Sequence, residues 1–480
     1  MNTATTSPTA TATLSRTRRS PLPVLLAGIF LIVLDFFVVN VALASIQADL
    51  RASDTAVEWI VAGYGLTFAV PLLGAGRLGD RFGRRRVFTV GIGAFTLSSA
   101  VCGFATNATM LVAARLVQGA AAALVSATVL ALIGVIYTGA AQARAISLYA
   151  TTMGVAAASA QLIGGVLVSA DVAGLGWRSV FLINVPIGLS ALLLTPRLIP
   201  ESRADRPGRT DVVGLLLVSV GLTALVLPLL EGRQQGWPPW TWLALAAVPA
   251  LLGGFLLRQR SLAGRGQQPL LDPRLFRSRS FSAGLAAQLA LWCGQASYFV
   301  VLALYLQQGR GLSPLRAGLV FTILAGAYLI ASAKSPTLAA RFGRLTVTGG
   351  ALILAAGHLA LLLATITDGV GGSVFALAPG LALTGAGMGL CIPALTGIVL
   401  GNADPQQSGA VSGALTTVQQ VGNAVGVAVI GLIFFPALSS GYDRAFELSV
   451  AALATLLIVL AVLTVALPSN RNGESHAVGA

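Results

Sequence analysis

The chain has 480 residues, of which 56% are hydrophobic and only 10% are charged. Soluble domains carry about 25% charged residues, so this composition excludes a water-soluble globular protein and indicates a chain that lipid solvates. The formal net charge is +14, but the basic residues lie in short segments between apolar runs. We therefore expect a lipid bilayer as partner, and no nucleic acid.

Residues 1–20 come first and are rich in Thr, Ala and Ser, with Arg16, Arg18 and Arg19 near their end. This composition predicts a disordered cytoplasmic tail. A cleaved signal peptide is the alternative. The apolar run that follows is long and contains an acidic residue, so we expect it to remain in the mature protein.

Fourteen apolar segments follow, and each approaches the roughly 20 residues that a helix needs to cross the hydrocarbon core. The first six lie at 22–44, 57–75, 87–106, 109–136, 145–170 and 179–196. Two more lie at 212–230 and 240–257, and the last six at 281–306, 315–333, 345–365, 373–399, 408–436 and 447–467. The sequence thus predicts an all-α membrane protein with fourteen transmembrane helices.

The arginines indicate how these spans are oriented. They concentrate in alternate loops, such as 76–86, 197–209 and 258–279, and they are sparse in the loops between. Cytoplasmic loops carry the excess of basic residues. We therefore predict a multi-pass protein of the cell membrane with both termini in the cytoplasm, which also requires an even number of spans.

A short repeat divides the chain. Arg-Phe-Gly-Arg at 81–84 follows the second span and recurs unchanged at 341–344, after the tenth. Parallel repeats of this kind are typical of transporters built from two similar halves. The predicted division is a tail at 1–20, a six-helix bundle at 21–196, a linker with two extra transmembrane helices at 197–280, a second six-helix bundle at 281–467, and a cytoplasmic tail at 468–480.

The loop 76–86 combines five arginines with one aspartate. Glycine permits a tight turn, and a carboxylate can accept from an arginine or from a helix N-terminus. Such a loop can act as a latch that holds two helices together in one conformation. The candidate latch residues are Gly76, Asp80, Arg81, Gly83 and Arg84. The alternative is a basic loop that only fixes topology.

Two charged residues inside apolar spans are the candidates for proton coupling. Asp35 lies in the middle of the first span, where a carboxylate is costly and is a functional candidate. Burial favours its neutral form and a nearby cation favours its charged form, which suits a group that binds and releases a proton. Arg115 lies in the fourth span, and we hypothesise that it couples to Asp35. The alternatives are a structural ion pair for Asp35 and an Arg115 that snorkels to the interface.

Polar and aromatic side chains within the spans are candidates for a substrate cavity, although packing is an equally good explanation for each. The candidates are Asn40, Gln118, Gln161, Trp292, Tyr298 and Tyr305. The three cysteines are far apart in sequence and have no metal-ligand spacing. We therefore expect no metal site and no cofactor.

The loop 76–86 resembles the signature loop of the major facilitator superfamily. The segments 34–43, 115–119 and 177–188 resemble motifs in the first, fourth and sixth helices of its fourteen-span drug–proton antiporters, and 305–307 and 408–426 resemble their second half. Two positions depart from the family pattern. Ala44 stands where proline is usual, and 160–165 keeps the Gly-Gly of the antiporter motif but has Ala160 and Gln161 in place of Gly-Pro.

The resemblance implies a secondary active transporter that exports small amphipathic or cationic compounds, such as drugs and antibiotics, by proton antiport through alternating access. Asp35 and Arg115 would couple the proton. The altered fifth helix leaves a uniporter or a proton symporter for a small metabolite as an alternative. A membrane-bound receptor or enzyme is a remote one, because no catalytic cluster and no nucleotide-binding loop occur. We expect no enzymatic activity, a monomer, and the proton gradient as energy source.

Overall fold

The computed structural model describes residues 20–203, 211–267, 269–401 and 408–464. These residues are helical or irregular, with no strand among them. Fourteen of their helical segments are long and apolar enough to cross a membrane, so the predicted fold class and number of spans are confirmed. Both predicted terminal tails lie outside the described residues, apart from Ser20.

The first group of helices provides six spans. They are α1 (Leu22–Leu50), α2 (Asp54–Phe82), α3 (Arg84–Gly103), α4 (Ala108–Ile136), α5 (Gly139–Ala170), and a last span built from η2 (Gly176–Arg178), α6 (Ser179–Leu182) and α7 (Asn184–Leu198), which η1 (Val172–Gly174) precedes. Polar caps begin two of them. Ser53 accepts a hydrogen bond of 3.2 Å from the Ala56 N–H, and Asn107 accepts one of 2.8 Å from the Met110 N–H.

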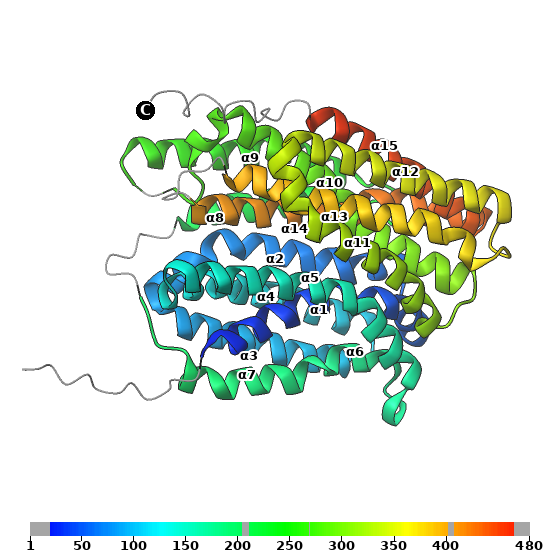
Figure 1. Cartoon of the computed structure of the whole chain (residues 1–480), viewed down its shortest axis with the longest axis horizontal. Helices are drawn as coiled ribbons and strands as arrows, with labels where there is room; N and C mark the ends of the chain where they lie inside the picture. The colour runs from blue at the N-terminus through cyan, green and yellow to red at the C-terminus, as the bar shows by residue number, and fades with distance from the viewer. Residues whose placement is uncertain (1–19, 204–210, 268, 402–407, 465–480) are drawn as a thin grey trace, which may run out of the picture.

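The second group also provides six spans. They are α10 (Arg279–Leu304) continued by the π-helical η4 (Tyr305–Gly309), α11 (Pro314–Phe342), α12 (Arg344–Asp368), α13 (Ala378–Gly401) after η5 (Val374–Leu377), α14 (Ser408–Ala437) followed by η7 (Leu438–Ser440), and α15 (Tyr442–Thr464). Figure 1 shows α1–α7 in the lower half of the molecule and α10–α15 in the upper half. The predicted domain boundaries, at 21–196, 197–280 and 281–467, remain predictions.

Two further helices, α8 (Val212–Glu231) and α9 (Pro239–Gly264), stand between the groups in sequence. They pack on each other, and α8 also packs on α2 and α14. Asp211 caps α8 and accepts hydrogen bonds from the Gly214 N–H, Arg258 and Gln259. Burial raises the pKa of Asp211, but these three donors outweigh it and hold the pKa below its usual value. Asp211 thus ties the beginning of α8 to the end of α9.

The repeated Arg-Phe-Gly-Arg sequence makes the same turn twice. Gly83 alone separates α2 from α3, and Gly343 alone separates α11 from α12. Their φ angles are +105° and +56°, a region that favours glycine. In each copy the arginine guanidinium lies over the following phenylalanine ring, at 5.4 Å for Arg81 and 5.1 Å for Arg341. The sequence repeat is therefore also a structural repeat.

The two groups meet mainly along two helix pairs, α2 with α14 and α5 with α11, and α1 adds smaller contacts with α10 and α11. In the second pair the backbones nearly touch. A Cβ on Gly165 would lie 2.7 Å from the Pro314 carbonyl oxygen, and one on Gly318 would lie 2.7 Å from the Gln161 carbonyl oxygen. Small residues allow such close approach between helices in a membrane. These two pairs are the surfaces along which the groups could move relative to each other.

Candidate functional site

We call the side of the molecule with the α1–α2 connection the outer side, and the side with Gly83 the inner side. The outer side lies to the right in Figure 1. The distribution of arginines predicts that the inner side faces the cytoplasm.

Asp35 of α1 and Arg115 of α4 form an ion pair inside the first group. Both side chains are fully buried, so Arg115 does not snorkel to the interface in this conformation. Its Nε donates 3.0 Å to the Ile60 carbonyl, and its guanidinium carbon lies 4.2 Å from the centre of the Tyr64 ring. Arg115 therefore contacts Asp35, and it also contacts a backbone carbonyl and an aromatic ring.

Two amides complete the carboxylate site. Gln118 donates 2.9 Å and Asn184 donates 2.8 Å to the same oxygen of Asp35, Oδ1. Both amides also reach the Ser99 hydroxyl, at 2.6 Å and 3.3 Å. Neither Ser99 nor Asn184 is among the site residues predicted from the sequence. Asn184 lies within the segment 177–188, and a polar side chain in an apolar span was the signal that could have identified it.

This cluster gathers α1, α3, α4 and α7 around one acid. Protonation of Asp35 would leave the charge of Arg115 without its counter-ion in a buried position, which is costly. Arg115 would retain the Ile60 carbonyl, the Gln118 oxygen at 2.7 Å and the Tyr64 ring. The arrangement can therefore convert a proton at Asp35 into a change in how four helices are held together.

A cavity of about 550 Å³ lies between the two groups. Its lining comes from α1, α4 and α5 on one side and from α10, α11, α13 and α14 on the other. Most lining residues are apolar, among them Phe37, Met153, Trp292, Phe299 and Phe321. The polar ones are uncharged, namely Tyr149, Gln161, Gln295, Tyr328, Thr396, Ser412, Thr416 and Gln419.

Only two of the six predicted cavity residues, Gln161 and Trp292, line this cavity. The other four do not line it in this conformation, because their side chains are buried against other groups. Asn40 donates 3.0 Å to the Phe37 carbonyl, and Gln118 belongs to the Asp35 cluster. Tyr298 packs at 4.8 Å on the His358 ring, and Tyr305 stacks at 4.1 Å on Phe446. Aromatic content alone did not distinguish a cavity wall from a packed interior.

The outer side of the cavity is closed by bonds between the groups. Gln307 Nε2 donates 2.9 Å to the Val41 carbonyl, and Gln308 Nε2 donates 2.9 Å to Gln47. On the opposite side the cavity extends to Leu400, near the inner end of α13. The conformation is thus closed at the outer ends and hollow toward the inner side.

The predicted latch is held by an acid of its own, Asp80, and by a second acid that lies outside it, Glu201. Asp80 pairs with Arg84 at 2.7 Å within the loop. Glu201, which follows α7, accepts 3.2 Å from the Arg85 N–H and lies 3.7 Å from the guanidinium groups of both Arg85 and Arg86. A Cβ on Gly83 would lie 2.6 Å from a Glu201 carboxylate oxygen. This junction requires glycine both for its φ angle and for the approach of Glu201.

Gly76 and Arg81 are less constrained than the latch hypothesis requires. A Cβ on Gly76 would meet nothing within 4 Å. The Arg81 guanidinium lies over Phe82, which is 52% exposed. In this conformation, therefore, Asp80, Gly83 and Arg84 belong to the junction, and Gly76 and Arg81 do not.

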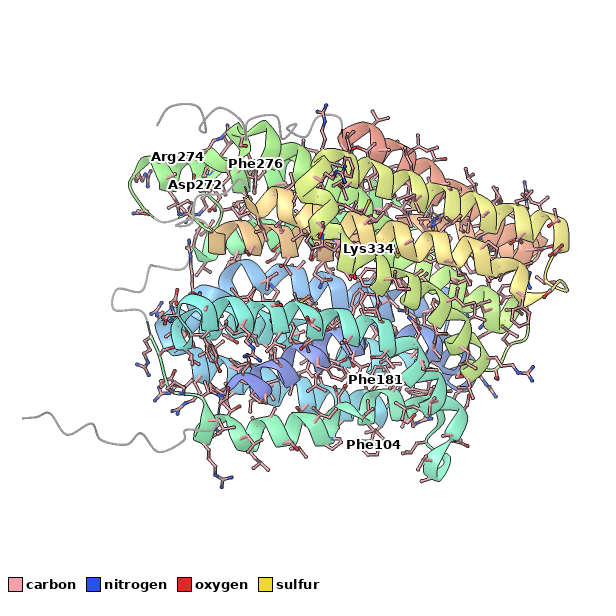
Figure 2. The ribbon with its side chains drawn as sticks, viewed as in Figure 1. Phe104, Phe181, Asp272, Arg274, Phe276 and Lys334 are labelled. Atoms are coloured by element: carbon pink, nitrogen blue, oxygen red, sulfur yellow. The ribbon has the colours of Figure 1, made fainter. Side chains whose placement is uncertain are left out.

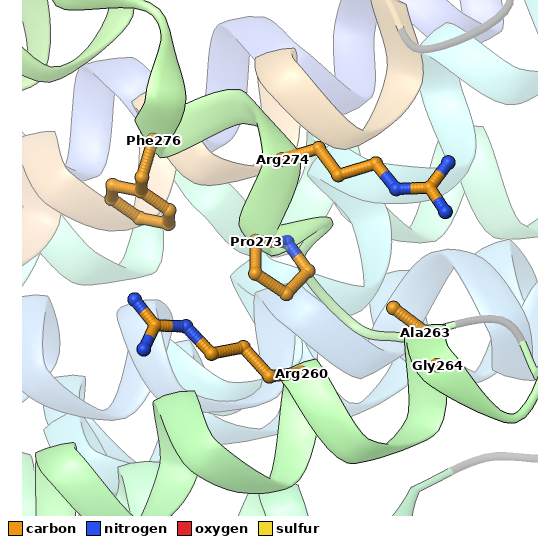
Figure 3. A pocket seen from close by; sticks show the side chains of 6 residues that line it. All are labelled: Arg260, Ala263, Gly264, Pro273, Arg274 and Phe276. Atoms are coloured by element: carbon orange, nitrogen blue, oxygen red, sulfur yellow. The ribbon is translucent and has the colours of Figure 1, made fainter.

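A second hollow, also of about 550 Å³, lies between the end of α9 and η3 (Pro273–Arg277). Arg260, Arg274 and Phe276 are among its lining residues, as Figure 3 shows. Figure 2 places Arg274 and Phe276 at the edge of the molecule, whereas Phe181, which is fully buried, lies within the first group. This basic hollow is separate from the central cavity and shares no lining residue with it.

Sequence comparison places these features among known transporters. The family model described as Major Facilitator Superfamily matches residues 25–427. A probable actinorhodin transporter of Streptomyces coelicolor is 41% identical, over 88% of this chain and 73% of that protein. The tetracenomycin C resistance and export protein of Streptomyces glaucescens is 32% identical, over 87% and 76%. The cephamycin export protein of Amycolatopsis lactamdurans is 34% identical, over 92% and 90%.

Solved structures agree on the fold. A D-xylose-proton symporter superposes with a TM-score of 0.67 at 15% identity, covering 94% of this chain and 98% of that one. A bacterial homologue of the human lysosomal transporter Spinster, in an inward-facing and unoccupied conformation, gives 0.65 at 18% identity, covering 93% and 96%. The fourteen helices and the match along most of the sequence show that this chain belongs to the major facilitator superfamily.

Proposed function

We propose that this protein exports small amphipathic compounds of the antibiotic type from the cytoplasm in exchange for protons, by alternating access. The central cavity carries the proposal, because it lies between the two groups and extends toward the inner side. Relatives whose names state transport, export or resistance to antibiotics support the direction and the class of cargo.

The cavity lining favours uncharged cargo over cations. None of its described lining residues is Asp, Glu, Lys or Arg. A cation would have to leave water without a counter-ion, which is unfavourable in apolar surroundings. Aromatic lining residues such as Trp292 and Phe299, together with the glutamines of the same lining, suit a flat molecule that carries a few hydrogen-bonding groups.

Coupling between cargo and proton would pass through α1. Val33 and Phe37 of this helix line the cavity, whereas Asp35 between them points into the buried cluster with Arg115. Gln161 of α5 lines the same cavity and donates 3.1 Å to the Phe37 carbonyl. A shift of α1 caused by protonation at Asp35 would therefore move Val33 and Phe37, and with them the cavity wall.

The altered fifth helix is the feature that favours the alternative of a uniporter or a symporter. Ala160 and Gln161 replace Gly-Pro, so the kink that a proline introduces is not expected there. Gly165 of the same helix nevertheless makes the close approach to α11. We therefore favour antiport.

The rest of the proposal is a monomer without a cofactor that lies in the cell membrane and has both termini in the cytoplasm.

Everted membrane vesicles test the proposal, since their exposed face is the cytoplasmic one. A proton gradient is formed across the vesicle membrane, and tetracenomycin C, uncharged Nile red or cationic ethidium is then added while a pH probe is read. Antiport predicts that a transported compound dissipates the gradient. The uncharged cavity lining predicts that Nile red or tetracenomycin C does so more than ethidium. Compound movement without proton movement would contradict antiport and support a uniporter.

Asp35→Asn supplies the residue-level test in the same vesicles. The substitution keeps the size of the side chain and removes its titration, so coupled exchange should be lost while the protein is still present in the membrane. The matched control is Asp368→Asn, at the end of α12 and far along the chain from the cluster. Full coupled exchange in Asp35→Asn would remove Asp35 from the mechanism.

A further inference from the structure

A second carboxylate, Glu58, is buried where the two groups of helices meet. It lies one turn into α2 from the outer end, and only 2% of it is exposed. Among the residues that the structure describes, no hydrogen bond and no ion pair reaches its carboxylate. A Cβ on Gly431 of α14 would overlap Glu58 Oε1, so this carboxylate lies directly against the backbone of the opposite group.

The surroundings of Glu58 are apolar. A void of about 10 Å³ beside it is lined by Ser297, Val300, Val301, Val427, Ile430, Gly431, Phe434 and Phe435. A void of this volume is at the lower limit for holding one water molecule. An ionised carboxylate without a partner is costly in such surroundings. The closed contact with α14 is therefore compatible with the neutral acid and opposes the charged form.

Three charged groups face Glu58 from the outer end of the molecule, namely Asp54 of α2, Glu231 at the end of α8, and Arg233. Arg233 is also engaged elsewhere. It lies 4.0 Å from the Asp54 carboxylate, and its guanidinium carbon lies 4.9 Å from the centre of the Phe435 ring. Trp59 donates 2.7 Å to Glu231. Arg233 thus lies at the limit of ion-pair distance from Asp54, and its Nε and Nη2 have no hydrogen-bond partner among the described residues. The two acids Asp54 and Glu231 disfavour a third negative charge at Glu58.

We propose that Glu58 is a second proton-binding site, and that a proton taken up from the outer side allows α2 and α14 to close on each other at Gly431. When the outer ends are apart, water reaches the carboxylate and it can ionise. Closure removes that water, so the acid must bind one proton for the contact to form. Acidic medium on the outer side therefore favours the closed state, and alkaline medium favours the open one.

This inference rests on the alternating access of the proposed function but does not require antiport. Glu58 could control closure of the outer side whichever way cargo and protons move. It also gives a role to the contact of α8 with α2 and α14, because α8 brings Glu231 to the outer end of the same interface.

The test measures the separation of the outer ends in the full chain. Spin labels are attached at Thr106→Cys and Ser440→Cys, two exposed positions in the outer α3–α4 connection and in η7, after replacement of the three native cysteines. The distance is recorded by electron–electron double resonance from acidic to alkaline pH. We expect it to lengthen as pH rises, and in Glu58→Gln to stay short throughout.

Glu447→Gln is the matched control, because Glu447 is a partly buried acid near the outer end of α15 that already pairs with Arg444 at 3.2 Å. It should respond to pH as the unsubstituted protein does. An identical pH response in Glu58→Gln, or no pH response in the unsubstituted protein, would overturn the proposal.

A second variant tests the contact without removing the charge. Gly431→Ala would force the Glu58 carboxylate out of its place, so the outer ends should stay apart even at acidic pH. Adding Glu58→Ala should restore closure, because the space needed by the new methyl group becomes free. A closed Gly431→Ala single variant would contradict the contact. Loss of dye-driven proton movement in vesicles with intact pH-dependent closure would instead contradict antiport alone.

Discussion

Asn184 donates a hydrogen bond of 2.8 Å to Asp35, although 149 positions separate the two residues in the chain. Asn184 is the first residue of α7, and Asp35 lies in the middle of α1. The last span of the first group therefore completes the polar site around Asp35 in the first span. This hydrogen bond also holds the first and last spans of the group together.

Replacement of Asn184 by leucine should impair coupled exchange. A hydrogen bond to a charged group contributes about 1.5–3 kcal/mol, so its loss should lower the exchange rate roughly tenfold or more. Ser190→Ala on the same helix is the control, because its exposed hydroxyl bonds only to the Pro186 carbonyl. The rates are compared in everted vesicles at equal protein content. A rate in Asn184→Leu equal to that of Ser190→Ala would contradict the positioning role.

The Asp35–Arg115 pair predicts a non-additive effect on stability. Arg115→Leu leaves the carboxylate buried without its cation, and removal of one partner of a buried pair costs about 3–5 kcal/mol. The double variant Asp35→Asn with Arg115→Leu removes both charges and should recover most of that loss without recovering exchange. Thermal unfolding in detergent, followed by size-exclusion chromatography, measures both variants. A double variant no more stable than Arg115→Leu would mean that the pair is not the cause.

The close approach of α5 and α11 predicts that Gly165 cannot be enlarged without loss of function. A Cβ at this position would lie 2.7 Å from the Pro314 carbonyl oxygen, so Gly165→Ala should separate the two helices at the outer side. We expect a several-fold lower exchange rate and a longer distance between labels on α5 and α11. Gly349→Ala on α12 is the control, because a Cβ there meets nothing within 4 Å.

The junction at Gly83 predicts a difference between two substitutions of Glu201. The partly exposed ion pairs of Glu201 with Arg85 and Arg86, at 3.7 Å, contribute about 0–1 kcal/mol each, whereas its bond to the Arg85 N–H survives in a glutamine. Glu201→Gln should therefore resemble the unsubstituted protein, and Glu201→Ala should be less stable by about 1 kcal/mol. Thermal unfolding distinguishes them. Equal loss in both variants would show that charge, and not the backbone bond, holds the junction.

The sequence by itself determined the number of spans and the two-part repeat, and it singled out Asp35 and Arg115, which the structure brings together as a buried ion pair. The bilayer is the physical reason, because a spanning helix must be apolar over about 20 residues. A charged residue within such a helix is costly and can therefore be identified from the sequence. The Arg-Phe-Gly-Arg repeat could be recognised for a different, local reason. The glycine in each copy has a positive φ angle, and the turn therefore requires glycine at that position.

Only the tertiary structure decided which polar and aromatic residues line the cavity and which are packed away. Gln118, Asn184 and Ser99 come from three helices and meet at Asp35, while Trp292 and Gln161 come from opposite groups and meet at the cavity. Which face of a helix is covered depends on its neighbours, and a span that is apolar on every side carries no periodic signal for that face. The burial of Glu58 against Gly431 has the same origin, because it exists only where α2 meets α14.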